Sequence, residues 1–453
     1  IKYSDSTELV YSIDLNGKHL SQIYTLYNKG FVISYRLIND GFEQLIDTKN
    51  LNFYWEGKMP KIEREMTDAR QRATTRYYTL SGNTDYISKT STKYEEMPID
   101  EYIKWMAFNQ KFFTASIISE KGFSKGLITL IPSNNDKTVK EGTLSSEIPF
   151  TDFLNNQAHF KFFFGPNKYN ILNQVTEGFS QNIELGWLFL PFINKYLIIP
   201  IFNFLEKFLS NYGLIIIIMV LIIRLILSPL TYKSHISMAK MRVLKPELDA
   251  IKEKHDGDMQ KAQSDQLELY RKAGINPLSG CIPVLLQFPI LVSLFYFIPS
   301  AIELRLESFL WADDLSSYDS IFNLPFNIPF YGDHVSLFTL LMAGSTILYT
   351  MANSQMTTIQ GPMKTMQYLM PIMFLFFFNS YPSGLSYYYF ITNLVSFGQI
   401  ALFRKFINED KIKLIMEENK KINVNKKKSK FQLRLEDAMK ANQAAQKSKG
   451  KKK

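Results

Sequence analysis

Arg224 lies within residues 214–230, a run that is long enough to cross a bilayer and holds no other charge. A cation on a membrane helix costs roughly 2.5–3.5 kcal/mol on insertion scales, so it is retained where it faces water, an opposite charge or a substrate. The simpler explanation is snorkelling, in which a long side chain near a helix end reaches the interface. Lys233 is the nearest flanking cation, and helical geometry places Arg224 roughly 13 Å deeper than it. The pattern therefore favours a hydrated, functional arginine over a structural one.

Five membrane spans are predicted after the N-terminal third of the chain. They are residues 214–230, 281–298, 335–351, 368–378 with its flanks, and 385–403. The last span carries more polar residues than the others, so we expect it to face protein partners rather than lipid. These residues are Ser386, Thr392, Asn393, Ser396 and Gln399. The lone cysteine, Cys281, rules out an intrachain disulfide, and its simplest role is packing.

The charge distribution predicts the orientation in the membrane. Residues 233–272 hold nine Lys and Arg, and the tail from Arg404 onward holds seventeen. Residues 301–334 hold one arginine against six acids. By the positive-inside rule the first two segments are cytoplasmic and the third lies outside. Five spans then place the N-terminal third outside, and we expect a signal or anchor helix that precedes Ile1 to export it.

Residues 1–180 are predicted to form an all-β domain. Short apolar runs, rich in β-branched and aromatic residues, are separated by Gly, Asn, Asp and Ser, a pattern that favours a β-sandwich. The runs are residues 9–15, 31–38, 102–108, 112–118, 126–131 and 159–165. His19 and His159 are isolated from other metal ligands, and clustered catalytic residues are absent. The pattern favours a scaffold or contact domain over a sugar- or ligand-binding domain, and it predicts no enzyme, metal or cofactor.

Residues 181–211 are predicted to form a linker and an amphipathic helix that lies on the outer face of the membrane. Charged residues interrupt this segment too often for a membrane span. Trp187 and Tyr196 suit the membrane interface, and Pro200 is expected to hinge the helix. The segment would lead into the first span.

Two charged segments are predicted on the cytoplasmic side. Residues 233–275 contain two helices separated by Asp256 and Gly257, and this hairpin is expected to bury little and to be mobile. Residues 405–453 form a basic tail with few hydrophobic residues, so we expect it to lack a fold. Such tails bind polyanions, either RNA or anionic lipid headgroups, although the tail could also be only a solvated topology signal.

Four stretches together closely resemble the YidC/Oxa family of membrane protein insertases, in its Gram-negative form. They are Ser-Met-Ala-Lys-Met-Arg at 237–242, Asn-Pro-Leu-Ser-Gly-Cys-Ile-Pro-Val-Leu-Leu-Gln-Phe-Pro at 276–289, Tyr-Pro-Ser-Gly-Leu at 381–385 and Tyr-Tyr-Tyr-Phe-Ile-Thr-Asn-Leu at 387–394. The resemblance runs from about residue 186 to 403, and the outer β domain looks like that form's periplasmic domain, a β-supersandwich. It implies a polytopic α-helical core of five spans over residues 212–404. The long basic tail and the missing first membrane helix are departures from the family pattern.

The resemblance also implies a site. In the family, core helices enclose a hydrophilic groove that is open to the cytosol and the lipid and closed toward the outside. Arg224, Gln287 and Asn393 match residues of this groove. The matches to the substrate-contacting face are Phe288, Leu291, Tyr388 and Tyr389. Met and aromatic residues of the later spans suit an adaptable sliding surface, although such a stripe is also ordinary on lipid-facing helices; they are Met363, Met366, Met370, Met373, Phe374, Phe376, Phe377 and Phe378.

The expected function is insertion and chaperoning of inner-membrane proteins. A water-filled half-channel with one cation lowers the desolvation barrier for a polar tail that must cross the bilayer, and it favours acidic or neutral tails. No ATP-binding motif is present, so hydrophobic transfer and the membrane potential would drive the step. The expected partners are nascent membrane proteins, membrane lipids and, through the basic tail, the ribosome. Whether the protein acts alone or beside the Sec translocon stays open. Two other functions stay open: an assembly scaffold without insertase activity, and an anion transporter.

Overall fold

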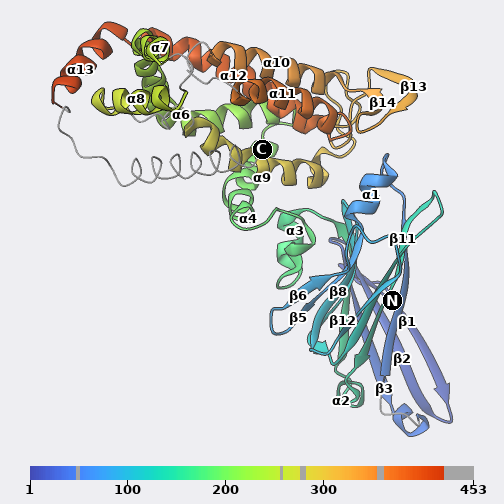
Figure 1. Ribbon diagram of the computed structural model, residues 1–453. Coiled ribbons are helices and arrows are strands. Elements are labelled where there is room, and N and C mark those ends of the chain that lie inside the picture. Colours follow the sequence, from blue (N-terminus) through green and yellow to red (C-terminus); the bar gives the residue numbers. More distant parts are fainter. Residues whose placement is uncertain (47–50, 256–258, 276–281, 355–361, 423–453) are drawn as a thin grey trace, which may run out of the picture. The chain divides into compact units, whose positions relative to one another are not determined.

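The computed structural model describes residues 1–46, 51–255, 259–275, 282–354 and 362–422 (Figure 1). The chain divides into two compact units. The first unit comprises Ile1–Ile215, Ile290–Phe338 and Phe378–Ser386, and the second comprises Ile216–Pro289, Thr339–Phe377 and Tyr387–Lys453. The N-terminal β domain belongs to the first unit, and most of the long helices belong to the second.

Two antiparallel sheets form the N-terminal domain, which confirms the all-β prediction. Eight strands in the order β1-β2-β3-β12-β9-β8-β5-β6 form the large sheet, and the small sheet has the order β4-β11-β10-β7. The strands are β1 (Ser6–Leu15), β2 (Lys18–Tyr27), β3 (Val32–Asp40), β4 (Leu51–Pro60), β5 (Thr74–Thr79), β6 (Thr84–Tyr86), β7 (Glu95–Ile99), β8 (Ile103–Asn109), β9 (Phe113–Phe123), β10 (Gly126–Pro132), β11 (Thr138–Ile148) and β12 (Ala158–Pro166). All six predicted runs coincide with strands, whereas β2, β4, β5, β6, β7 and β11 were not predicted.

The core of the domain lies between the two sheets. Alternate side chains of the small sheet, such as Met59 and Leu144, pack against Met106, Ile117 and Phe160 of the large sheet, and all five are buried. This is the inward alternation expected of a β-sandwich, in which every second residue of a strand faces the partner sheet. Three short helices accompany the strands: α1 (Met66–Arg72), α2 (Phe150–Leu154) and α3 (Tyr169–Val175).

A helical segment follows the β domain. It consists of α4 (Leu190–Ile193), a π-helical turn (Asn194–Ile198) and α5 (Ile199–Glu206). Ile198 and Ile199 both have right-handed helical backbone angles, so the helix continues through the proline. A π turn and a proline are both common causes of helix kinks, so the hinge at Pro200 stays a prediction.

One face of this segment is apolar and uncovered within the part of the chain that the structure describes. Its exposed large side chains are Trp187, Leu188, Phe189, Phe192, Tyr196, Phe204 and Phe208. The opposite face is buried through Leu190, Ile198, Phe202 and Leu205. A helix with a packed face and an exposed aromatic face has the pattern expected at a membrane interface.

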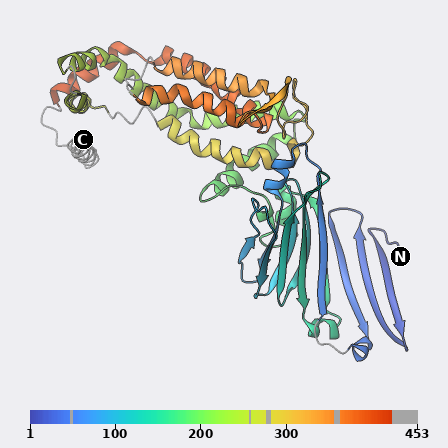
Figure 2. The same cartoon turned by 45° about the vertical axis from the view of Figure 1, so that its right-hand side comes forward.

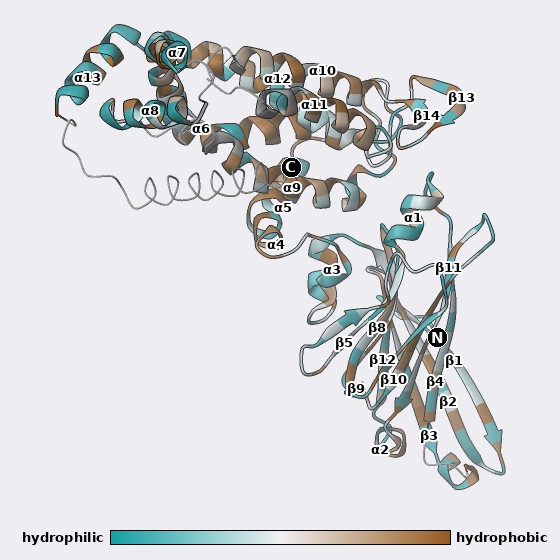
Figure 3. Cartoon of the chain, viewed as in Figure 1, coloured by the Kyte–Doolittle hydropathy of each residue, from teal (hydrophilic) through white to brown (hydrophobic). Residues whose placement is uncertain are grey.

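Each of the five predicted spans corresponds to a helix. These helices are α6 (Tyr212–Val243), α9 (Ile282–Ser300), α10 (Leu337–Ser354), α11 (Pro362–Phe378) and α12 (Ser383–Phe406). Within the described residues, α6 is the one helix that is long enough and contains an apolar stretch long enough to cross a membrane. Shorter apolar helical segments lie at Gln287–Ser300, Leu337–Ala352 and Met366–Phe378. Figure 3 shows the hydrophobic residues along α9, α10 and α11. The five predicted helices are therefore present, and their crossing of the membrane as five spans stays a prediction.

The helical hairpin predicted at residues 233–275 has a core of its own, so the prediction that it buries little is wrong. Its helices are α7 (Lys245–Lys254) and α8 (Met259–Lys272), and they pack with the end of α6 and with α13 (Glu409–Ile422). The buried residues include Leu248 and Tyr270 from the hairpin and Met416 from α13. An ion pair of 2.6 Å joins Arg242 to Glu409, and a second joins Lys420 to Glu247. The first part of the predicted unfolded tail is therefore a docked helix, and residues 423–453 lie outside the described residues.

Candidate functional site

Arg224 connects three helices of the second unit. Its side chain is 7% exposed, and Nη2 donates hydrogen bonds to Oε1 of Gln287 on α9 (3.0 Å) and to the carbonyl oxygen of Thr392 on α12 (3.4 Å). A guanidinium carries five N–H donors. Nε and Nη1 make no hydrogen bond with the residues that the structure describes. The arginine thus keeps donors for a further acceptor.

No described carboxylate forms an ion pair with Arg224, and the ionisable side chains that interact with it electrostatically are those of Tyr349, Tyr388 and Tyr389. Burying a cation without an opposite charge is costly, and two hydrogen bonds to neutral oxygens offset only part of that cost. The uncompensated charge of Arg224 would attract an anionic group, and a role in binding one stays a prediction.

Polar side chains along α12 continue the site. Ser396 Oγ donates to the Thr392 carbonyl oxygen at 2.6 Å, and Gln399 Nε2 donates to the backbone carbonyl oxygen of Arg224 at 3.3 Å. Residues 392, 396 and 399 are spaced by four and three positions, so they share one helix face. This is the polar face that the sequence predicted to meet protein rather than lipid.

Asn393 forms its hydrogen bonds with α10 and not with α6, the helix that carries Arg224. Its Nδ2 donates to Ser345 Oγ at 3.0 Å and to Thr346 Oγ1 at 2.9 Å, both on α10. The structure therefore brings Gln287 to Arg224 directly, whereas Asn393 joins the site through the neighbouring Thr392. The sequence analysis did not name Ser345 and Thr346, although two adjacent small polar residues in an apolar helix are a usable signal.

The predicted substrate-contacting residues differ in exposure. Phe288 is 62% exposed, and Leu291, three residues along α9 and on the same helix face, is half-buried. Tyr388 is 2% exposed and Tyr389 is half-buried. In this conformation Phe288 offers an accessible ring and Tyr388 does not, and contact with a client stays a prediction for all four.

The Met- and Phe-rich helix α11 has a broad exposed face. Its exposed side chains are Met366, Leu369, Met370, Ile372, Met373, Phe376 and Phe377, whereas Phe374 is half-buried and Phe378 is buried. The side chain of Met363 lies outside the described residues. Flexible thioether side chains fit varied apolar partners, so this face suits either lipid or a sliding apolar segment.

A half-buried ionic cluster in the first unit fixes the ends of several elements. Lys168 Nζ, just before α3, pairs with Glu206 at 2.9 Å and with Glu303 at 3.4 Å. Tyr212, the first residue of α6, donates its hydroxyl to Glu206 at 3.1 Å. Burial raises the pKa of the Glu303 carboxyl. The two carboxylates already have a cation between them, so the cluster holds the linker against α5 and α6 rather than presenting free charge.

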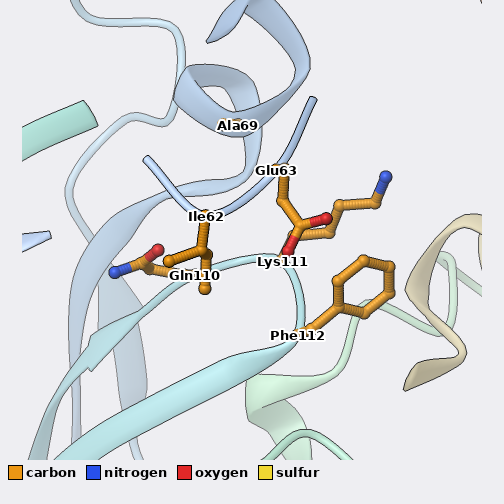
Figure 4. Close-up of a pocket in the computed structure, with 6 residues that line it drawn as sticks. All are labelled: Ile62, Glu63, Ala69, Gln110, Lys111 and Phe112. Atoms are coloured by element: carbon orange, nitrogen blue, oxygen red, sulfur yellow. The ribbon is translucent and has the colours of Figure 1, made fainter. Parts of the chain in front are cut away.

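A shallow pocket in the β domain does not present a free charge either (Figure 4). It is lined by Ile62, Glu63, Ala69, Gln110, Lys111 and Phe112. Lys111 Nζ pairs with Asp68 at 2.8 Å, and Glu63 pairs with Arg305 at 2.9 Å, so both charged side chains at the pocket are neutralised. Within the described ranges no three His, Cys, Asp or Glu side chains are placed to hold a metal ion.

Comparison with known proteins agrees with the architecture over both parts of the chain. Residues 3–200 match the family described as YidC periplasmic domain, and residues 204–411 match the family described as 60Kd inner membrane protein. A membrane protein insertase YidC from Amoebophilus asiaticus is 49% identical over 94% of this chain and 72% of its own length. Those from Parabacteroides distasonis and Cytophaga hutchinsonii are 38% and 41% identical, each over 98% of this chain and 73% and 75% of their own lengths. The chain belongs to the YidC family of membrane protein insertases.

Proposed function

We propose that this protein inserts inner-membrane proteins and assists their folding through a hydrophilic groove whose cation is Arg224. The observation that carries the proposal is the setting of this arginine: buried on an apolar helix, bonded to Gln287 and the Thr392 carbonyl, and without a described acidic partner. Membership of the insertase family supports the overall activity. The arginine adds a physical role for one residue within that activity.

The groove would act by lowering the cost of moving a polar tail partway across the bilayer. Water and the Arg224 charge replace part of the hydration that the tail loses, so the barrier falls most for acidic tails. The apolar segment of the client would meanwhile pass along Phe288 and Leu291 on α9 and along Tyr388 and Tyr389 on α12, and then enter lipid. Transfer of its apolar surface out of water supplies the driving force.

As a member of this family, the chain is a bacterial inner-membrane protein with a periplasmic domain. We further infer that α6, α9, α10, α11 and α12 are five spans, with residues 1–180 and 301–334 periplasmic. The hairpin and residues 405–453 would then be cytoplasmic. The excess of Lys and Arg in the latter two segments supports this orientation. Nascent membrane proteins are the proposed clients, and the basic tail is the proposed contact with the ribosome.

Reconstitution in liposomes tests the proposal against its two alternatives. Purified protein in liposomes should move a small single-span membrane protein into a protease-protected position, whereas empty liposomes should not. A scaffold would give no insertion, and an anion transporter would instead release a trapped anion. Insertion at the rate of empty liposomes would refute the proposed function.

A further inference from the structure

A tight turn with an apolar tip lies in the loop between α9 and α10, which are yellow and orange in Figure 2. The backbone N–H of Phe309 donates to the Ala312 carbonyl oxygen at 2.9 Å, and the N–H of Ala312 donates back to the Phe309 carbonyl oxygen at 3.0 Å. Leu310 and Trp311 are therefore the two central residues, and they are 70% and 36% exposed. Glycine and small polar residues are usual at such a position in water. We call residues 309–312 the Leu310 turn.

The backbone of Leu310 has a left-handed conformation, with a φ of 55°. Glycine, asparagine or aspartate usually occupies a turn position of this kind, because a larger side chain is strained there. In water leucine would be unfavourable here for two reasons, the backbone conformation and the exposed apolar surface. Strain that persists at one residue points to a use for its side chain.

Two packing contacts hold the Leu310 turn beside the starts of two long helices. The ring of Phe309 lies so close to Gly213, in the first turn of α6, that a Cβ atom would not fit there. The indole of Trp311 packs on Phe338, in the first turn of α10, with ring centroids 4.3 Å apart. Its Nε1 donates to Asp319 at 2.8 Å, and Asp319 also accepts the backbone N–H of Phe338 at 3.1 Å. The turn is thus fixed at the level where α6 and α10 begin.

The start of α6 is also where an uncovered apolar stripe begins. Leu214, Leu221 and Leu225 are exposed, and their spacing of seven and four residues places them on one face of the helix. α6 is long and apolar enough to cross a membrane, and the family consists of inner-membrane proteins, so this stripe suits lipid. Leu214 directly follows Gly213, against which the Leu310 turn packs. The turn therefore adjoins the end of a face that suits lipid.

The same two residue types recur in the segment that has the pattern of a membrane interface. Trp187 and Leu188 are both exposed there, and Leu188 also has a φ of 55°. Trp is favoured at membrane interfaces because its ring is apolar and its N–H is polar. A lipid surface would meet both segments at once, whereas a covering protein segment would have to match each of them separately. Asp313 is exposed just after the Leu310 turn, so only a shallow position would keep its carboxylate hydrated.

We propose that the Leu310 turn binds the lipid surface of the outer leaflet, with the side chains of Leu310 and Trp311 in the headgroup region beside α6. The bilayer would supply the apolar surroundings in which an exposed leucine is favourable. The same loop pairs with the β domain, through Arg305 and Glu63 at 2.9 Å, so lipid contact would fix a segment that also holds the β domain. The proposal goes beyond the insertase activity and depends only on α6 crossing the membrane.

Quenching by labelled lipids tests the inference on the full chain in liposomes. Cys281→Ser removes the only cysteine, and Leu310→Cys then carries a fluorescent nitrobenzoxadiazole label. Lipids with a nitroxide near the headgroup should quench this label at least about twofold, because interfacial side chains lie about 5–10 Å into the boundary. Tyr54→Cys is the matched control, since Tyr54 is similarly exposed on β4, and its label should be quenched less than about 1.2-fold. Leu221→Cys, on the α6 stripe, is the positive control for lipid contact.

Tryptophan fluorescence gives a measurement without a label. Trp55 and Trp105 pack in the cores of the β domain, so Trp187 and Trp311 are the two tryptophans that lipid would reach. Brominated lipid should quench the unaltered protein, and the quenched fraction should fall by about half in Trp311→Phe. Phenylalanine keeps a ring against Phe338, and equal thermal unfolding would show that the fold is kept.

Two results would overturn the proposal. In the first, the label of Leu310→Cys emits as in water and is quenched no more than that of Tyr54→Cys, although the label of Leu221→Cys is quenched. In the second, the label of Leu310→Cys emits as in an apolar environment but lipid does not quench it. That result would assign the Leu310 turn to a protein surface, either another part of this chain or a second copy. Neither measurement detects client insertion, so insertion in the same liposomes shows separately whether the proposed function holds.

Discussion

Replacing Arg224 with alanine tests the electrostatic argument for the groove. The substitution removes one hydrogen bond of 3.0 Å to Gln287 and a longer one of 3.4 Å to the Thr392 carbonyl. A hydrogen bond to a charged group contributes about 1.5–3 kcal/mol, and relief of the buried charge offsets part of that loss. The Thr392 carbonyl also keeps the bond from Ser396. We therefore expect the free energy of unfolding to change by less than about 2 kcal/mol.

The effect on insertion should depend on the charge of the client. A carboxylate about 4 Å from the guanidinium gains roughly 4 kcal/mol at an effective dielectric constant of about 20, before desolvation. If desolvation leaves about 1.4–2.7 kcal/mol, the insertion rate of an acidic-tailed client should fall about tenfold to a hundredfold in Arg224→Ala. A client whose translocated tail is neutral should slow by less than about threefold.

The assay compares two clients that differ only in tail charge, inserted into liposomes that contain each variant. Arg224→Lys keeps the charge and should retain most of the acidic-tail rate. Gln287→Leu is the matched control for the lost hydrogen bond, since it removes the acceptor and keeps the cation. Equal insertion of the acidic-tailed client by Arg224→Ala and the unaltered protein would refute the reasoning, as would equal slowing of both clients.

Three further predictions concern other parts of the chain. Burial lowers the pKa of Lys140 from 10.5 to about 8, so between those pH values the unfolded state binds more protons and the free energy of unfolding should rise with pH. Chemical denaturation at several pH values should show this rise in the unaltered protein and in the exposed control Lys137→Met, but not in Lys140→Met. Because α7, α8 and α13 share a core, Met416→Asp should speed hydrogen exchange around Leu248 and Tyr270, whereas the exposed control Leu414→Asp should not. Fast exchange in the hairpin of the unaltered protein would contradict the shared core. Truncation after Ile422 keeps α13 and removes most of the tail's positive charge, so ribosome co-sedimentation should weaken at low salt, and the difference from the full chain should shrink as salt rises. Equal ribosome binding by the truncated and full chains at every salt concentration would leave the tail a topology signal or a lipid contact.

The sequence alone predicted those elements whose pattern is local. Alternation identified strands such as β1 and β12, and long apolar runs identified the five helices. β4 was missed although Phe53, Trp55 and Met59 alternate along it, because Gly57 interrupts the pattern as a turn residue would. In the folded domain a Cβ atom at Gly57 would lie 2.6 Å from the Phe108 ring, so the glycine admits a side chain from the facing sheet.

The core that α7, α8 and α13 share was decided by tertiary structure. Each of α7, α8 and α13 is charged and has few apolar residues, so each by itself has the composition of a solvated helix. Together they bury Leu248 and Tyr270 of the hairpin and Met416 of α13, which is more than 140 residues further along the chain. A pattern within one helix cannot contain that information, because the stabilisation comes from apolar surface that two separate segments bury jointly.

The candidate site divides in the same way. The sequence was enough to single out Arg224, because a lone cation in an apolar run is costly wherever that run packs. Gln287, on a helix 63 residues away, was named only through the family resemblance. The second acceptor, 168 residues away, is the backbone carbonyl of Thr392, and every residue has such a group. Residue types determine which charge needs partners, but a backbone acceptor is selected by the packing of helices, and only the folded chain brings it within hydrogen-bond distance.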